Sequence, residues 1–219
     1  MLSMEFSIPI WYIRDMDKIL VFGDSIVYGK WDPQGGWVNR LRKYVDETFN
    51  LGKKGNVQVY NLGIPGELAI RMKNRFEMEL SQRIDSDTKG LVIIAIGVND
   101  SCPNNWMTNK QTDEAELKAA LSEMVLIARK YSCKICFIGL MPVNPARAKK
   151  LQFTDEAVKI YDGYISEVAE KESVQKIDLF DSFKAQGFSE KLVDSVHPDE
   201  EGHRLIFETV RPIIEKSIL

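Results

Sequence analysis

The sequence predicts an α/β fold, in which helices cover both faces of a central, mostly parallel sheet of five strands. Three observations lead to this prediction. Short apolar runs alternate along the chain with longer amphipathic stretches. One run, residues 91–96, is apolar throughout, as in a strand that is covered on both faces. The stretches between the runs are long enough to hold crossover helices, which parallel strands require.

Five apolar runs are interpreted as strands, at residues 18–22, 57–62, 91–96, 134–140 and 175–179. Between them, apolar residues recur at helical spacing in residues 37–49 and 68–84 and again in residues 200–217. Thr112 and Thr154 each precede a further amphipathic stretch and are predicted to cap its helix. No internal repeat or linker divides the chain. We therefore expect one domain over residues 1–219, with residues 1–17 as an N-terminal extension.

Composition and charge exclude several classes of function. The 29 basic and 32 acidic residues are spread along the 219-residue chain and leave a net charge of −3, so no basic surface for nucleic acid is expected. No apolar run approaches the roughly 18 residues that span a bilayer, which argues against stable membrane insertion. The N-terminal region lacks the pattern of a signal peptide, and three cysteines are too few for a disulfide framework. We expect a cytoplasmic protein.

Two of the cysteines form a C-x-x-C pattern, Cys133 and Cys136. A redox pair of this kind sits at the N-terminus of a helix, which lowers the pKa of a thiol. Here the pair opens the predicted strand 134–140, where side chains three residues apart point to opposite faces. The pattern is interpreted as structural.

The residues that follow the predicted strands are the candidates for chemistry, because ligands of open α/β sheets bind beyond the carboxyl ends of the strands. Ser25 follows the first strand within Gly-Asp-Ser-Ile, and Gly63 follows the second within Asn-Leu-Gly-Ile-Pro-Gly. Asn99 follows the third within Gly-Val-Asn-Asp. Each of these residues, taken alone, also fits an ordinary turn.

A histidine just before the last helix changes this balance. His197 stands in Asp-Ser-Val-His-Pro, and Asp194 lies three residues before it. A serine nucleophile needs a base such as histidine, and the base needs a partner that fixes its tautomer. The only other histidine, His203, lies inside the final helix and is interpreted as structural. The aspartates and histidines show no metal-ligand spacing, so no metal is predicted.

Taken together, these segments resemble the four sequence blocks of the GDSL/SGNH hydrolases, a family of lipases and esterases. The blocks occur in family order from residue 22 to residue 198, and Ile26 replaces the usual leucine. The resemblance implies a three-layer α/β/α fold of flavodoxin-like type. It also implies that Ser25 is the nucleophile, His197 its base and Asp194 the residue that orients the base. The oxyanion hole would consist of the backbone N–H groups of Ser25 and Gly63 and the side-chain amide of Asn99.

The sequence thus predicts a serine hydrolase that cleaves short-acyl carboxylic esters through an acyl-enzyme and needs no cofactor. Its partner would be a small-molecule acyl ester, and the oligomeric state is not predicted. Acyl-CoA thioesterase, lysophospholipase and carbohydrate deacetylase activities remain as alternatives. Two non-hydrolytic alternatives are a catalytically silent binding module of the same fold and a binder of flavin or nucleotide.

Residues around the substrate are predicted less specifically. The candidate substrate-binding residues are Asp24, Tyr28, Trp106 and Val196. Trp31 is a further aromatic residue after the nucleophile, and such residues wall a ligand site or anchor a loop. Cations of the loop that includes Arg147 and Lys150 would meet an anionic leaving group or form a solvated surface.

Overall fold

The computed structural model describes residues 16–52, 55–86, 88–148 and 150–218. Five strands form one sheet in the order β2-β1-β3-β4-β5, and all four neighbouring pairs are parallel. The strands are β1 (Met16–Gly23), β2 (Asn56–Gly63), β3 (Gly90–Ala95), β4 (Lys134–Ile138) and β5 (Gln175–Ile177). The predicted α/β class and its parallel five-stranded sheet are confirmed.

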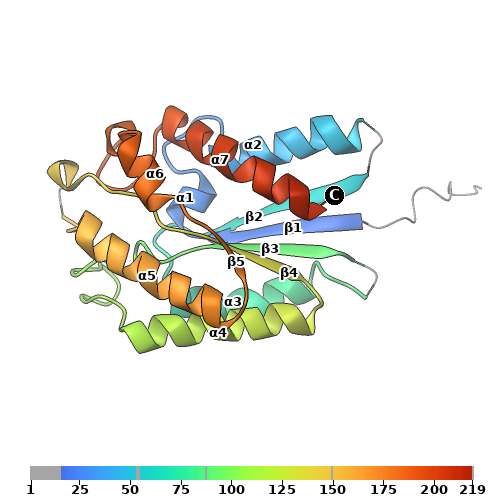
Figure 1. Cartoon of the computed structure of the whole chain (residues 1–219), viewed down its shortest axis with the longest axis horizontal. Coiled ribbons are helices and arrows are strands. Elements are labelled where there is room, and N and C mark those ends of the chain that lie inside the picture. Colours follow the sequence, from blue (N-terminus) through green and yellow to red (C-terminus); the bar gives the residue numbers. More distant parts are fainter. Residues whose placement is uncertain (1–15, 53–54, 87, 149, 219) are drawn as a thin grey trace, which may run out of the picture.

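Helices cover both faces of this sheet and complete three layers (Figure 1). One face carries α2 (Gly36–Val45) and α7 (Glu200–Ile218), which pack against each other. The other face carries α3 (Ala69–Ser81), α4 (Glu114–Lys130) and α5 (Asp155–Lys171). The shorter helices are α1 (Ser25–Tyr28) and α6 (Phe180–Ala185), with η2 (Asp46–Asn50), η3 (Pro145–Arg147) and η4 (Phe188–Lys191).

The core lies on both sides of the central strands. Leu20, Val21 and Phe22 of β1 are fully buried, although successive side chains of a strand point to opposite faces. The first five residues of β3 are likewise buried. A continuous apolar run is therefore what a strand between two helical layers needs, as the run at residues 91–96 predicts.

Several element boundaries differ from the prediction. The cap assigned to Thr112 is wrong by one residue, because Asp113 is the N-cap of α4 and the Thr112 hydroxyl donates to Asp100 at 2.8 Å. Thr154 caps α5 as predicted, accepting from the Ala157 N–H at 3.2 Å. β4 ends at Ile138 and β5 at Ile177, each two residues earlier than predicted, and α6 was not predicted.

The remaining sequence interpretations concern cysteines, membrane insertion and the N-terminus. Cys133 and Cys136 are buried free thiols, and burial raises their pKa values to about 11 and about 12, as befits structural residues. In the part of the chain that the structure describes, no helix combines the length and apolarity needed to cross a membrane. Of the expected N-terminal extension, residues 1–15 lie outside the described residues.

Candidate active site

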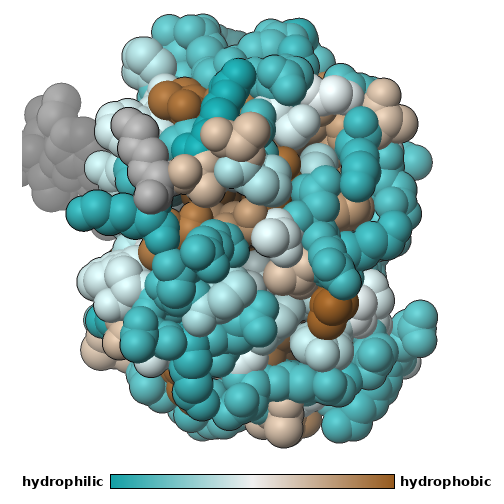
Figure 2. Space-filling view, turned by 90° about the vertical axis from the view of Figure 1, so that its left-hand side faces the viewer, coloured by the Kyte–Doolittle hydropathy of each residue, from teal (hydrophilic) through white to brown (hydrophobic). Residues whose placement is uncertain are grey.

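The predicted site residues come together at the carboxyl end of the sheet, at the left of Figure 1. Ser25 begins α1 directly after β1, and Gly63 ends the neighbouring strand β2. Asn99 lies in the turn after β3, and His197 lies in the segment before α7. Figure 2 looks onto this end of the molecule, where hydrophobic residues lie near the centre among hydrophilic ones.

Asp24 shapes the turn that carries Ser25. Its Oδ1 accepts the N–H of Ile26 at 2.9 Å and so caps the short helix α1. At the other end of α1, Gly29 is left-handed and its N–H donates to the Ser25 carbonyl at 3.1 Å. The turn thus holds Ser25 at the first position of α1, where the residue is 4% exposed.

The side chains of Ser25, His197 and Asp194 form a chain of close polar contacts. Ser25 Oγ lies 2.9 Å from His197 Nε2, and His197 Nδ1 lies 2.7 Å from Asp194 Oδ2. A carboxylate at Nδ1 favours the tautomer with its proton there, which leaves the Nε2 lone pair facing the serine hydroxyl. This arrangement can remove a proton from Ser25 when the hydroxyl attacks.

The loop around Asp194 is folded so that its carboxylate stays charged. Its Oδ1 accepts the backbone N–H groups of Val196 at 3.0 Å and His197 at 2.9 Å. Partial burial opposes ionisation, but the hydrogen bonds from the His197 side chain and from these two N–H groups outweigh it. They hold the pKa of the Asp194 carboxyl well below its usual range. Asp194 is therefore a carboxylate at any pH at which the protein would work.

Gly63 pairs with Gly23 and Asn99 contacts Asp24, so both lie next to the turn that carries Ser25, but their predicted oxyanion donors have other partners in this structure. The Asn99 amide donates to the Glu67 carbonyl at 3.2 Å and to Asp24 Oδ2 at 3.4 Å. The Gly63 N–H donates to Asn61 Oδ1 at 3.0 Å. To stabilise an oxyanion at Ser25, each donor would have to leave its present acceptor or donate to both acceptors at once.

Gly63 is required by the close approach of α1 to the end of β2. A Cβ at this position would lie 2.4 Å from the Tyr28 nitrogen and 2.8 Å from the Asp24 carbonyl oxygen. Both distances are far inside van der Waals contact, so a larger residue would push α1 and its serine away from the sheet. The glycine of the second sequence block therefore has a packing reason that does not depend on catalysis.

The four candidate substrate-binding residues fall into two groups. Tyr28 and Trp106 are 56% and 65% exposed on the rim of this end of the sheet. Asp24 and Val196 are buried, at 2% and 7% exposed, and line a cavity of about 30 Å³ between the sheet and α7. Burial raises the pKa of the Asp24 carboxyl to about 7, and the charges of Asp100 and Glu67 add to this effect. Asp24 thus faces the protein interior.

Three residues near the site were not predicted to belong to it. Asn61 holds the Gly63 N–H and also donates to the Val27 carbonyl at 2.8 Å. Its place two residues before Gly63 in the second block is the only sequence signal for this role. Glu67 supplies a carbonyl to Asn99, and no sequence signal marks a backbone acceptor. Trp31, considered from the sequence only as a wall or anchor, donates to Asp194 at 3.2 Å.

The cationic loop has partners of its own. Arg147 Nη1 donates to the Leu192 carbonyl, and Nη2 lies 3.5 Å from Glu190. This guanidinium therefore ties the loop to the segment before α7, which makes it less available to an anionic leaving group. His203 is fully buried in α7, in agreement with its structural interpretation.

The chain is similar in sequence and in fold to known esterases. The human "isoamyl acetate-hydrolyzing esterase 1 homolog" is 25% identical over 218 residues, which cover 92% of this chain and 82% of the relative. An acetylxylan esterase from Geobacillus stearothermophilus superposes with a TM-score of 0.72 at 22% identity, covering 92% of this chain and 95% of the other.

A second solved structure has the same fold. An α/β hydrolase from the metagenome of Lake Arreo, Spain, superposes with a TM-score of 0.72 at 18% identity, covering 92% and 96% of the two chains. The model of the GDSL-like lipase/acylhydrolase family matches residues 21–205. The matched residues include all four sequence blocks, which supply the side chains at the carboxyl end of the sheet. The chain therefore belongs to the GDSL-like lipase/acylhydrolase family and is an ester hydrolase.

Proposed function

We propose that this ester hydrolase cleaves short-acyl carboxylic esters, acetyl esters above all, with Ser25 as its nucleophile. The observation that carries the proposal is the contact chain from Ser25 Oγ to His197 Nε2 at 2.9 Å and from His197 Nδ1 to Asp194 at 2.7 Å. A serine, a histidine and a carboxylate in this order form the arrangement that activates a hydroxyl for acyl transfer.

The proposed reaction has two steps. The Ser25 oxygen attacks the ester carbonyl carbon while His197 Nε2 takes the hydroxyl proton. The tetrahedral intermediate then collapses, and His197 returns the proton to the leaving alcohol, so that the acyl group remains on Ser25. Water then attacks this acyl-enzyme while His197 takes a proton from it. The bond between the acyl carbon and Ser25 Oγ breaks, His197 returns the proton to Ser25 Oγ, and the carboxylic acid leaves. Asp194 keeps the imidazole oriented and stabilises its charged form throughout.

The negative charge of each intermediate would lie beside three donors, the N–H groups of Ser25 and Gly63 and the Asn99 amide. In the described structure, Asn99 and Gly63 donate to neighbouring acceptors at 3.0–3.4 Å. A negatively charged oxygen is a stronger acceptor than the Asn61 amide oxygen or the Glu67 carbonyl, so it would compete well with these two. The remaining acceptor, Asp24 Oδ2, is the most distant at 3.4 Å, and burial favours its neutral form by raising the Asp24 pKa to about 7. The donors would then favour the transition state over the ground state, as catalysis requires.

Two relatives support an acetyl substrate by their names. One is named for hydrolysis of isoamyl acetate and the other for acetylxylan, so both descriptions name an acetyl ester. The exposed Tyr28 and Trp106 fit a leaving group that lies across an open surface. The engagement of Arg147 with Glu190 argues against a leaving group as anionic as coenzyme A.

The test is hydrolysis of p-nitrophenyl esters from acetate to palmitate by the wild-type protein and by Ser25→Ala. We expect the highest kcat/KM on acetate or the next shortest chains, and loss of activity in the variant. Residual hydrolysis by Ser25→Ala at the wild-type rate would exclude the serine mechanism. An optimum on long chains would keep the mechanism but contradict the acetyl specificity.

A further inference from the structure

A tryptophan completes the set of hydrogen bonds around the carboxylate of Asp194. The Trp31 indole N–H donates to Asp194 Oδ2 at 3.2 Å, the same oxygen that lies 2.7 Å from His197 Nδ1. The other oxygen, Oδ1, accepts the N–H groups of Val196 and His197. With the indole in place, each oxygen of the carboxylate has two hydrogen-bond partners, and these four contacts fix the orientation of the carboxylate plane.

Trp31 occupies a backbone position that disfavours it. The Asp32 N–H donates to the Gly29 carbonyl at 3.2 Å, which closes a four-residue turn with Lys30 and Trp31 at its centre. Trp31 has a φ of +70°, so the turn is of type II, in which the third residue is usually glycine. A bulky residue in the left-handed region is rare, and such residues cluster at functional sites.

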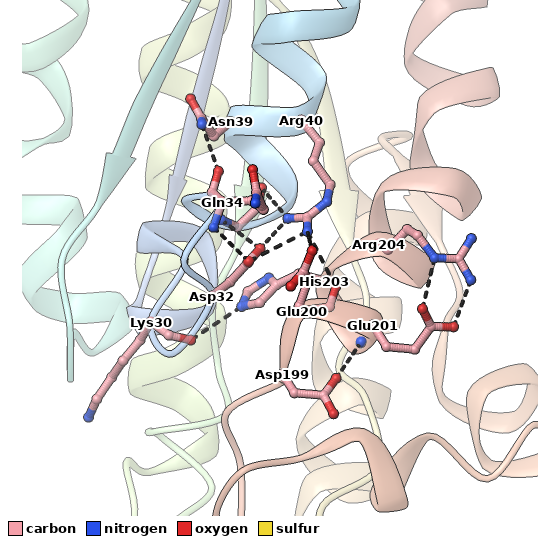
Figure 3. A network of polar contacts seen from close by, with 12 residues as sticks. Lys30, Asp32, Gln34, Asn39, Arg40, Asp199, Glu200, Glu201, His203 and Arg204 are labelled. Carbon is pink, nitrogen blue, oxygen red and sulfur yellow. Dashed lines mark hydrogen bonds and ion pairs between the residues drawn. The ribbon is translucent and has the colours of Figure 1, made fainter.

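The rest of the molecule holds this turn in place. At its start, the Lys30 N–H donates to the Ser25 carbonyl at 3.0 Å. At its end, the Asp32 carboxylate accepts the Gly36 N–H at 3.0 Å and pairs with Arg40, which also reaches the Glu200 carbonyl at 3.4 Å (Figure 3). These contacts join the turn to the first residues of α2 and α7, so the position of Trp31 is set from both sides.

Burial does not explain the tryptophan. Trp31 is 55% exposed, so about half of the ring gains nothing from leaving water. Apart from the bond to Asp194, its described polar contact is the Lys30 ammonium, 5.1 Å from the ring centroid. A glycine would fit the turn better, and a smaller apolar residue would suit the surface equally well. Neither of these residues could donate an N–H from its side chain to the Asp194 carboxylate, as the indole does.

We propose that Trp31 is a positioning residue for the reaction, holding the Asp194 carboxylate in line with His197. This inference rests on the proposed function, since it assumes that the His197–Asp194 pair activates Ser25. Loss of the indole N–H would leave Oδ2 with one protein partner and free the carboxylate to rotate away from Nδ1. The serine would then be less reactive, while the rim around the substrate stays in place.

The experiment measures the rate at which a fluorophosphonate labels Ser25, together with kcat and KM for p-nitrophenyl acetate. Trp31→Phe removes the N–H and keeps an aromatic ring. Trp31→Gly removes the whole side chain and suits the left-handed backbone. Lys30→Ala is the matched control, because it alters the same turn and retains the indole N–H.

We expect Trp31→Phe to label roughly threefold to tenfold more slowly than wild type, the range for one hydrogen bond to a partly exposed carboxylate. Its kcat should fall by a similar factor with KM unchanged. Trp31→Gly should lose at least as much reactivity while its melting temperature stays the same or rises, because glycine relieves the strained turn. A loss of reactivity without any loss of stability cannot come from a merely structural role. Lys30→Ala should label like wild type.

Two results would overturn the inference while leaving the proposed function intact. One is labelling of Trp31→Phe at the wild-type rate. The other is a change confined to KM, which would make the ring a wall of the substrate site. Failure of the wild-type protein itself to be labelled would instead refute the serine mechanism, and the role of Trp31 with it.

Discussion

Asp100 lies next to the candidate oxyanion donor and gives a quantitative test of the buried electrostatics. It is fully buried; Oδ1 accepts the Thr112 hydroxyl at 2.8 Å and the Ala69 N–H at 3.2 Å. Burial raises the pKa of its carboxyl to about 6 from the ordinary value of 3.8, although these hydrogen bonds oppose the shift. An asparagine at this position keeps Oδ1 as acceptor and carries no charge.

The sign of the effect follows from the two pKa values. Between about pH 4 and pH 6 the unfolded chain releases this proton before the folded protein does, so stability falls as the pH rises through this window. Above about pH 6 the loss is complete and constant. A shift of about two pKa units corresponds to a free energy on the order of 3 kcal/mol.

We therefore expect Asp100→Asn to become more stable, relative to wild type, as the pH rises. The free energy of unfolding of both proteins would be measured by urea titration from pH 4 to pH 8. Over this pH range the difference between them should shift in favour of the variant by about 2–3 kcal/mol, mostly below pH 6. Other groups titrate in both proteins and largely cancel. A difference that does not change with pH would refute the assignment of a destabilising buried charge to Asp100.

Two further predictions concern the site itself. Asn99→Ala should retain the fold and KM but lose kcat by about 10²–10³, the usual effect of one oxyanion donor; an unchanged kcat would remove Asn99 from that role. Gly63→Ala should lose most activity, because its Cβ would lie 2.4 Å from the Tyr28 nitrogen. Gly163→Ala in α5 is its control, with nothing within 4 Å, and should be stabilised by about 0.5–1 kcal/mol; equal activity of the two variants would contradict the steric argument.

The sequence predicted the sheet and the residues at its carboxyl end because both depend on local signals. A run of apolar residues indicates a covered strand, whichever strand it pairs with in the sheet. Parallel strands all have their carboxyl ends at the same edge of the sheet. Ser25, Gly63 and Asn99 could therefore be expected together before any contact between them was known. The bounds of β4 and β5 were less accurate, since the last residues of the predicted strands turn toward other partners, as when the Leu140 N–H donates to Asp162.

What could not be predicted are the contacts that reach across the fold. Thr112 and Asp113 are both good helix caps by residue type, but in the fold the Thr112 hydroxyl donates to the Asp100 carboxylate and Asp113 is the N-cap. The partner of the Gly63 N–H depends on the rotamer of Asn61. The bond from Trp31 to Asp194 joins two loops that the sequence gives no reason to pair, and its turn has tryptophan where the turn rules call for glycine.

The distance along the chain between the proposed nucleophile and its base has a consequence for how activity is acquired. Ser25 and His197 are 172 positions apart, and the base lies just before the last helix. During synthesis, the serine and its turn emerge early, but His197 cannot reach them until the 172 further positions up to it have also left the ribosome. Since contacts between distant segments form slowly, recovery of esterase activity on refolding should follow the closing of α7 against α2. The reaction thus reports on the completion of folding, and a chain that stops short of residue 197 would carry a nucleophile without the means to use it.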